Sequence, residues 1–329
     1  MEEFNQKTER KYMNRFGLMY MLGVLVIYAL QYGIVFFLGR FAPQIKENQT
    51  MLFAFEMLPL YVLGYPLMML FISTVPKYRI PQKKMTFGQF LLAFIMCYSL
   101  LYISNLVGTA VTGTIGLLRG RAVDNVLLDI VTNIHPAFVI LFAVVLAPVF
   151  EELIFRKMLV DRMIRYGEAT AVLFSGMMFG LFHGNFNQFV YAFVLGCFFG
   201  FLYVKTGRIQ YTIILHIIVN FMGTVVGMLF LKQIPMEELA NADTFSAMSE
   251  FVMKHMLPLL LYMAYVFFLL ALVIAGIVLC IVFRKKFRCS HQGVVTIPKG
   301  KRFSTLILNV GMSLFILFWG AMILYRFFQ

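Results

Sequence analysis

Apolar stretches long enough to cross a lipid bilayer recur along the whole of this 329-residue chain. A spanning helix needs about 20 mostly apolar residues, because the hydrocarbon core offers no water to pair with exposed backbone groups. Hydrophobic residues make up 61% of the chain and charged residues only 13%, an excess that soluble domains rarely reach. The candidate spans, whose ends are defined to within a few residues, are 16–39, 51–75, 88–109, 137–155, 168–185, 187–204, 210–230, 257–283 and 304–325.

These spans predict an all-α fold, a polytopic transmembrane helical bundle of about nine helices, with eight as an alternative. No internal repeat or long linker divides the sequence, so residues 1–329 are expected to form a single transmembrane domain. Of the 28 basic residues, 21 lie in segments on the same side of this bundle as the N-terminus, and seven lie on the opposite side. The bias predicts a cytoplasmic N-terminus and an integral, multi-pass membrane protein.

The net charge of +13 does not require a polyanionic partner, because the basic residues form short clusters between the spans. Membrane topology accounts for that distribution. We therefore expect the lipid bilayer as the surroundings and no nucleic acid as a partner. Two connections between spans are long: 110–136, whose segment 123–131 has an amphipathic pattern, and the polar segment 231–256. Both are expected to be solvated loops, with an interfacial position as the alternative for the first.

One membrane span ends in two adjacent carboxylates and an arginine, Glu151, Glu152 and Arg156. Each ionisable group at the centre of a membrane helix costs about 2.5–3.5 kcal/mol on insertion scales, so such groups indicate function by default. Glu152 and Arg156 are four residues apart, which favours an ion pair. Glu151 is rotated by about 100° from Glu152 and can face a different cavity.

Later spans carry further polar residues at helical spacing: His183 lies four residues after Phe179, and Asn220 lies four residues after His216. If the first helical hairpin turns at Gly167, the rise of ~1.5 Å per residue places Glu151 and His183 at nearly the same height. A second turn near Gly207 brings His216 and Asn220 to a height comparable with that of Glu151 and His183. The sequence therefore allows these groups to meet in one site within the membrane.

The three patterns, Glu-Glu-x-x-x-Arg, Phe-x-x-x-His and His-x-x-x-Asn, fall in order within about 70 residues. Together they resemble the CAAX protease and bacteriocin-processing family of intramembrane endopeptidases, which includes the eukaryotic Ras-converting enzyme. The resemblance covers 137–228 as a catalytic core, leaving 1–136 and 231–329 as accessory helices. It implies a bacterial plasma-membrane protein that cleaves a membrane-associated peptide or protein.

What the resemblance implies is hydrolysis by glutamate-activated water, without a cofactor. Glu151 would be the general base, and His183 would position or polarise the water. His216 and Asn220 would stabilise the oxyanion, whereas Glu152, Arg156 and Phe179 would support the site. A carboxylate in a low-dielectric cavity becomes a better base near neutral pH, which is compatible with this assignment.

Two alternatives remain open at this stage. In the first, Glu151, His183 and His216 hold a zinc ion, with water as the fourth ligand. The absence of a His-Glu-x-x-His helix and the presence of an amide at Asn220 disfavour this metalloprotease. In the second, the chain is a non-catalytic immunity or scaffold protein, and the polar residues form a buried network.

Overall fold

The computed structural model describes residues 2–120 and 133–328 of the chain. Within these residues the regular elements are all helices, apart from one isolated bridge between Glu2 and Val295. The segment 123–131, which was expected to be an amphipathic loop, lies outside the described residues. The longer α-helices are α1 (Gln6–Phe41), α2 (Gln49–Pro59), α3 (Tyr65–Ser73), α4 (Phe87–Arg119), α9 (Glu168–Phe182), α10 (Phe186–Thr206), α11 (Ile209–Asn220), α14 (Phe245–Lys254), α15 (Met256–Val282) and α17 (Val310–Phe328). The shorter ones are α6 (Pro136–Phe138), α7 (Ala147–Glu152), α8 (Leu159–Met163), α12 (Gly227–Leu231), α13 (Met236–Ala240) and α16 (Arg302–Leu306).

The predicted all-α membrane bundle is confirmed. Seven helices in the described part of the chain are long and apolar enough to cross a membrane, and an eighth arises if the bent pair Lys299–Leu306 and Val310–Arg326 counts as one span. The remaining expected span, 168–185, corresponds to α9, whose 15 residues are apolar but short. The protein is thus an integral, multi-pass membrane protein.

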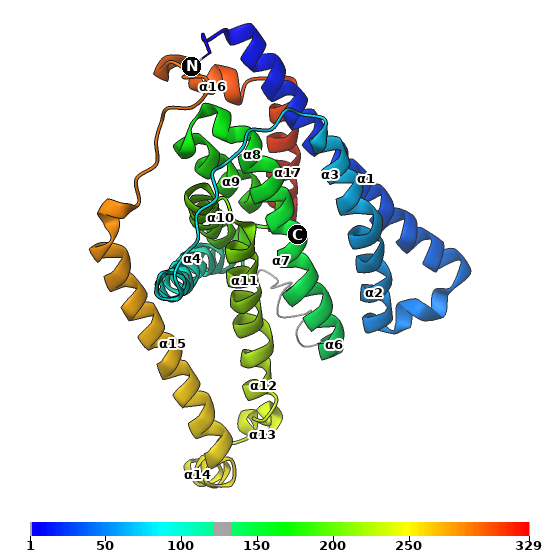
Figure 1. Cartoon of the computed structure of the whole chain (residues 1–329). Helices are drawn as coiled ribbons and strands as arrows, with labels where there is room; N and C mark the ends of the chain where they lie inside the picture. The colour runs from blue at the N-terminus through cyan, green and yellow to red at the C-terminus, as the bar shows by residue number, and fades with distance from the viewer. Residues whose placement is uncertain (1, 121–132, 329) are drawn as a thin grey trace.

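The five segments expected on the cytoplasmic side lie in the same half of the molecule as the N-terminus (Figure 1); they are the residues before 16, 76–84, 156–165, 205–208 and 284–302. Backbone hydrogen bonds join them there: Lys83 N–H to Thr206 O (2.7 Å), Ala169 N–H to Ser290 O (3.0 Å) and Glu2 N–H to Val294 O (2.8 Å). These contacts agree with the predicted alternation of the spans. The assignment of this end to the cytoplasm stays a prediction.

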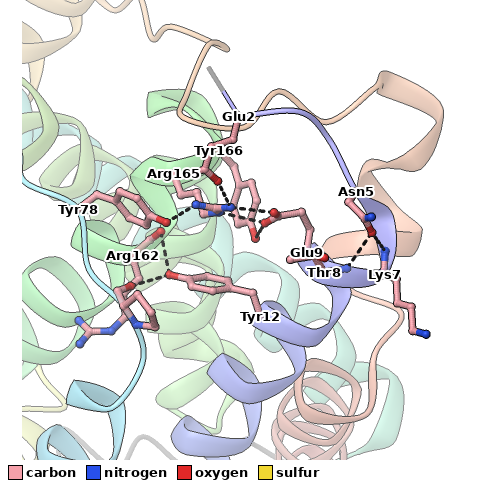
Figure 2. A network of polar contacts seen from close by, with 11 residues as sticks. Glu2, Asn5, Lys7, Thr8, Glu9, Tyr12, Tyr78, Arg162, Arg165 and Tyr166 are labelled. Atoms are coloured by element: carbon pink, nitrogen blue, oxygen red, sulfur yellow. Dashed lines mark hydrogen bonds and ion pairs between the residues drawn. The ribbon is translucent and has the colours of Figure 1, made fainter.

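A polar cluster around Arg165 ties this end together (Figure 2). Its guanidinium donates to both carboxylate oxygens of Glu9 at 3.0 and 2.8 Å, to Glu2 at 2.6 Å and to the Tyr78 hydroxyl. Tyr166 also donates to Glu9, at 2.7 Å. Arg165 and Tyr166 belong to the turn that joins the helices of the first predicted hairpin, so the cluster anchors that turn to α1 and to the loop after α3.

Both predicted hairpin turns are confirmed. A continuous helical span runs from Pro136 to Tyr166 and stops at Gly167, whose φ of 94° is a conformation that residues with a side chain rarely adopt. The second turn, at Gly207, has φ 59° and ends α10 before α11 begins at Ile209. The first turn makes α9 an antiparallel neighbour of the span that carries the double glutamate, and the second makes α11 antiparallel to α10.

Helices α9 and α10 touch through glycines. A Cβ added at Gly196 would lie 2.7 Å from the Cα of Gly176, and one at Gly176 would lie 2.7 Å from the carbonyl oxygen of Phe193. Small residues allow membrane helices to approach closely, which is how such helices gain packing energy without a hydrophobic driving force. The close approach fixes the position of α9, which presents Phe179 and His183 near its C-terminal end.

The span Pro136–Tyr166 is interrupted by π-helical turns at Val139–Leu146 and Leu153–Met158, on either side of α7. In the first of these turns Ala147 N–H bonds to the carbonyl five residues back, Phe142 O. The same five-residue pattern would pair residue 148 with Ala143 O, but Pro148 has no N–H to donate. Widened turns of this kind are rare and occur most often at functional sites.

Side chains from four other helical segments donate to backbone carbonyls of this interrupted span. These donors are the hydroxyls of Tyr20 (to Ile154, 2.8 Å), Tyr61 (to Phe142, 3.1 Å) and Ser175 (to Phe155, 3.0 Å) and the amide of Asn220 (to Ala143, 2.9 Å). An unpaired carbonyl in a membrane interior costs several kcal/mol, so these donors support the irregular backbone around Glu151 and Glu152.

Candidate active site

Glu151 and Glu152 approach the same imidazole ring from its two nitrogens. Glu152 Oε1 lies 2.9 Å from Nδ1 of His216, and Glu151 Oε2 lies 3.6 Å from Nε2. The sequence allowed Glu151 to face a cavity of its own, whereas the structure places both carboxylates around His216. The difference is in access: the Glu152 side chain is fully buried, and that of Glu151 is 15% exposed.

The contact with Glu152 decides which nitrogen of His216 carries a proton. An ionised carboxylate can only accept, so Nδ1–H is the donor, and the lone pair of a neutral ring is on Nε2, facing Glu151. Two acceptors facing each other repel. The 3.6 Å between Glu151 Oε2 and His216 Nε2 is longer than an ordinary hydrogen bond, so the two atoms face each other without a direct bond.

Arg156 completes the buried part of the site. Its Nε lies 3.0 Å from Glu152 Oε2, so the predicted ion pair is present, and both side chains are fully buried. Nε and both Nη atoms lack a well-aligned hydrogen-bond partner among the described residues. The guanidinium instead lies 4.4 Å from the ring centre of Phe179 and 5.3 Å from that of Phe199. Aromatic faces attract cations, which gives Phe179 a direct part in holding the charge.

His183 is placed at the C-terminal end of α9, where the Phe179 carbonyl lies 2.9 Å from its Nδ1. A carbonyl can only accept, so Nδ1 donates, and Nε2 of the neutral ring is left as an acceptor. The ring packs edge-on against Phe179, whose own ring packs edge-on against His216. Glu151 lies within electrostatic range of His183. The hairpin therefore brings both histidines to one cluster.

Asn220 lies at the end of α11, one turn beyond His216. Its amide donates to Ala143 O at 2.9 Å, the carbonyl that Pro148 cannot reach with a hydrogen bond. A primary amide has two N–H donors, so this bond leaves one donor for another acceptor. The structure thus gives Asn220 a supporting contact that its sequence position did not predict.

Three tyrosines near Glu151 were missed by sequence reasoning. Tyr61, Tyr65 and Tyr191 all lie within electrostatic range of Glu151. Tyr61 and Tyr65 also pack against Phe150, with ring centres 5.4 and 5.5 Å from it. The spacing of four residues between Tyr61 and Tyr65 put them on one helical face, but tyrosines are common in membrane helices and this signal alone did not single them out.

The donors fit a metal ion only in part. Glu151 Oε2 and His216 Nε2 are 3.6 Å apart, close to the roughly 3.3 Å between two ligands of one tetrahedral zinc ion. Within residues 2–120 and 133–328, however, no three His, Cys, Asp or Glu side chains are arranged to hold a metal ion. The set predicted as the zinc alternative, Glu151, His183 and His216, does not come together as a ligand triad.

Comparisons with known proteins match the same part of the chain. Residues 133–222 match the model of the Rce1-like family, described as type II CAAX prenyl endopeptidase Rce1-like. This segment contains every predicted site residue, from Glu151 to Asn220. This segment is similar to the CAAX endopeptidases, as the three sequence patterns indicated. The Rce1-like segment includes the interrupted span Pro136–Tyr166 and both hairpin turns.

One curated protein matches part of the chain. The chain is 28% identical over 158 residues to a protein of Bacillus subtilis (strain 168) described as "Putative membrane peptidase YdiL". The match covers 46% of this chain and 63% of that protein, so the relative is matched over less than two thirds of its length. No solved structure matches the chain at a significant level.

Proposed function

We propose that this protein is an intramembrane endopeptidase that hydrolyses a membrane-associated peptide or protein with water activated by Glu151. The observation that carries the proposal is the asymmetric pair of glutamates around His216. Glu152 is fully buried and bound to Arg156, whereas Glu151 keeps 15% exposure and faces Nε2 of the ring. The family match over residues 133–222 supports peptide hydrolysis as the reaction class.

In this mechanism Glu151 and His183 hold the attacking water between them. One water hydrogen is donated to a Glu151 oxygen and the other to Nε2 of His183, the nitrogen left free by the Phe179 carbonyl. The water oxygen attacks the carbonyl carbon of the scissile peptide bond, and its proton moves to Glu151. Glu151 then passes that proton to the leaving amine as the C–N bond breaks.

The negative charge that develops on the carbonyl oxygen is stabilised by nearby donors. The second amide hydrogen of Asn220 and a proton on His216 Nε2 are the groups proposed for this role. Loss of one such donor in a preorganised site costs about 2.7–4 kcal/mol of transition-state stabilisation. The Tyr65 hydroxyl, near Glu151, is a further candidate donor. A Tyr65→Phe protein is expected to fold and to cleave more slowly.

The test uses cells that produce Glu151→Gln, wild type or the matched control Glu47→Gln. Glu47 is exposed at the end of the short helix after α1, so its substitution changes the same charge away from the site. Membrane fractions are compared by mass spectrometry of peptides and new chain termini. We expect one or more full-length substrates to accumulate with Glu151→Gln alone. Identical termini in all three strains would contradict hydrolysis and favour the non-catalytic scaffold.

Metal dependence is tested separately on the purified protein with the substrate so identified. Glutamate-activated water predicts that cleavage persists after treatment with a zinc chelator. Loss of cleavage that added zinc restores would instead support the metalloprotease alternative, because the metal would then supply the activated water.

A further inference from the structure

A pocket of about 330 Å³ opens between the end of α3 and α8, apart from the candidate active site. Its lining shares no residue with that site and carries three basic side chains: Lys77, Lys157 and Arg162. Asp161 is the acidic residue in the lining, so the pocket has an excess of two positive charges. Its volume is at the lower end of the range of about 300–1,000 Å³ for small-molecule sites, which suits one compact charged group.

Arg162 is built into the wall of this pocket. Only 1% of the residue is exposed, and its Nη1 donates to Met158 O at 2.8 Å. Its Nε is buried without a hydrogen-bond partner in the described residues. Figure 2 shows the guanidinium turned away from the Arg165 cluster. Leaving a buried N–H of a permanent cation unpaired costs free energy, so an anionic acceptor that paired with Arg162 Nε–H would be stabilising.

The two lysines add donors at the mouth of the pocket. Lys157 Nζ bonds to Asp161 Oδ2 at 2.8 Å and to the Tyr203 hydroxyl at 3.1 Å. Its ammonium has three hydrogens, so one of them can still be donated to a ligand. Lys77 is exposed and has no hydrogen bond or ion pair with any of the described residues. Lys77, Lys157 and Arg162 all line the pocket, so it offers three basic side chains to a phosphate.

The pocket lies where a membrane span ends. Ser73, one of its lining residues, is the last residue of the span Gln49–Ser73. Leu70, one turn earlier on α3, is 60% exposed and therefore faces lipid chains in a membrane. The same end of the molecule carries most of the basic loops, and basic pockets between helices at such an interface bind anionic headgroups.

We propose that this pocket binds the phosphate headgroup of an anionic phospholipid, with Arg162, Lys157 and Lys77 as its donors and the acyl chains lying along α3. The headgroup supplies the acceptor that the buried Nε of Arg162 lacks. The exposed apolar face of α3 distinguishes a lipid from free inorganic phosphate, because only a lipid uses both surfaces.

The experiment measures the thermal unfolding midpoint of the full-length protein in neutral detergent micelles, titrated with dioleoyl phosphatidylglycerol. Dioleoyl phosphatidylcholine and inorganic phosphate are the comparison ligands. We expect a saturable rise of the midpoint with phosphatidylglycerol and none with either comparison ligand. An equal rise with phosphatidylcholine would overturn the charge recognition, and saturation by inorganic phosphate alone would overturn the assignment to a lipid.

Two variants locate the binding. Lys77→Glu reverses an exposed charge without breaking a described contact, and Lys84→Glu makes the same change at an exposed position of the same loop outside the pocket. Lys77→Glu is expected to weaken phosphatidylglycerol binding on the order of tenfold, whereas Lys84→Glu leaves it unchanged. If both variants weakened phosphatidylglycerol binding equally, the effect would come from the general surface charge, and the assignment of the lipid to this pocket would be wrong. Arg162→Lys keeps the charge but lacks the Nε–H donor, and unchanged binding by it would overturn the role given to that atom.

Discussion

Helices α10 and α15 are both of membrane-spanning length, but their surroundings differ. In the most apolar part of α10, 56% of the residues are buried, against 11% in α15. α10 lies inside the bundle next to the candidate site, whereas α15 runs along one side of the molecule (Figure 1). Hydropathy alone ranks α15 as the stronger span, with a mean of 3.1 against 1.7. Apolar composition therefore does not measure burial in this protein: the most apolar helix, α15, is the least buried of the candidate spans, whereas the less apolar α10 packs inside the bundle.

The largest effect on stability is expected from Arg156→Gln, inside the bundle. Removal of the guanidinium leaves Glu152 buried without its ion-pair partner, which costs about 3–5 kcal/mol in comparable buried pairs. The matched change outside the bundle is Lys254→Gln, which breaks the exposed pair with Glu238 next to α15. Denaturant unfolding in detergent should show a large decrease of the unfolding free energy for Arg156→Gln and no measurable change for Lys254→Gln. Equal losses would mean that burial does not separate the two regions.

A smaller decrease of the unfolding free energy is expected from Gly196→Ala, because the new Cβ would lie 2.7 Å from the Cα of Gly176 on α9. Overpacking of this kind costs about 1–3 kcal/mol. Gly227→Ala is the control, since a Cβ at that position meets nothing within 4 Å. The control should be neutral or stabilising, because alanine favours a helix. If both proteins unfold alike, α9 and α10 are not held by their close approach.

The smallest effect is expected where α15 meets α4. The Ser99 hydroxyl donates to Val273 O at 2.9 Å, and such interhelical bonds in membranes average about 0.6 kcal/mol. Ser99→Ala should therefore lower the unfolding free energy only slightly. Ser104→Ala, whose hydroxyl bonds to Leu100 O within its own helix, is the comparison. A loss as large as that of Gly196→Ala would show that α15 is a structural part of the bundle after all.

Several features of the fold and the site could be predicted from the sequence because they depend on local rules. Gly167 and Gly207 end their helices with positive φ, as expected, and the four-residue spacing of Glu152 and Arg156 gives the ion pair. The clustering of His183 and His216 follows from the positions of these turns and the helical rise.

The remaining features depend on contacts between distant segments, which no local pattern encodes. The π-helical turns around α7 lie in a run that is apolar on all sides, so the change of periodicity leaves no polar stripe to detect. The convergence of Glu151 and Glu152 on His216 requires the position of α11. The donors to the carbonyls of this span come from distant segments: Tyr20 on α1 lies 134 residues from its acceptor Ile154, and Asn220 lies 77 residues from Ala143.

The most direct test of the central claim compares Glu151→Gln with Glu152→Gln in the same purified protein. Both the unfolding midpoint and the cleavage of the substrate found by peptide comparison are measured. We expect Glu151→Gln to keep a wild-type midpoint and to lose cleavage, because the Glu151 carboxylate activates water but supports little structure. Glu152→Gln should lower the midpoint, because it removes the buried partner of Arg156. Wild-type cleavage by Glu151→Gln would contradict the account.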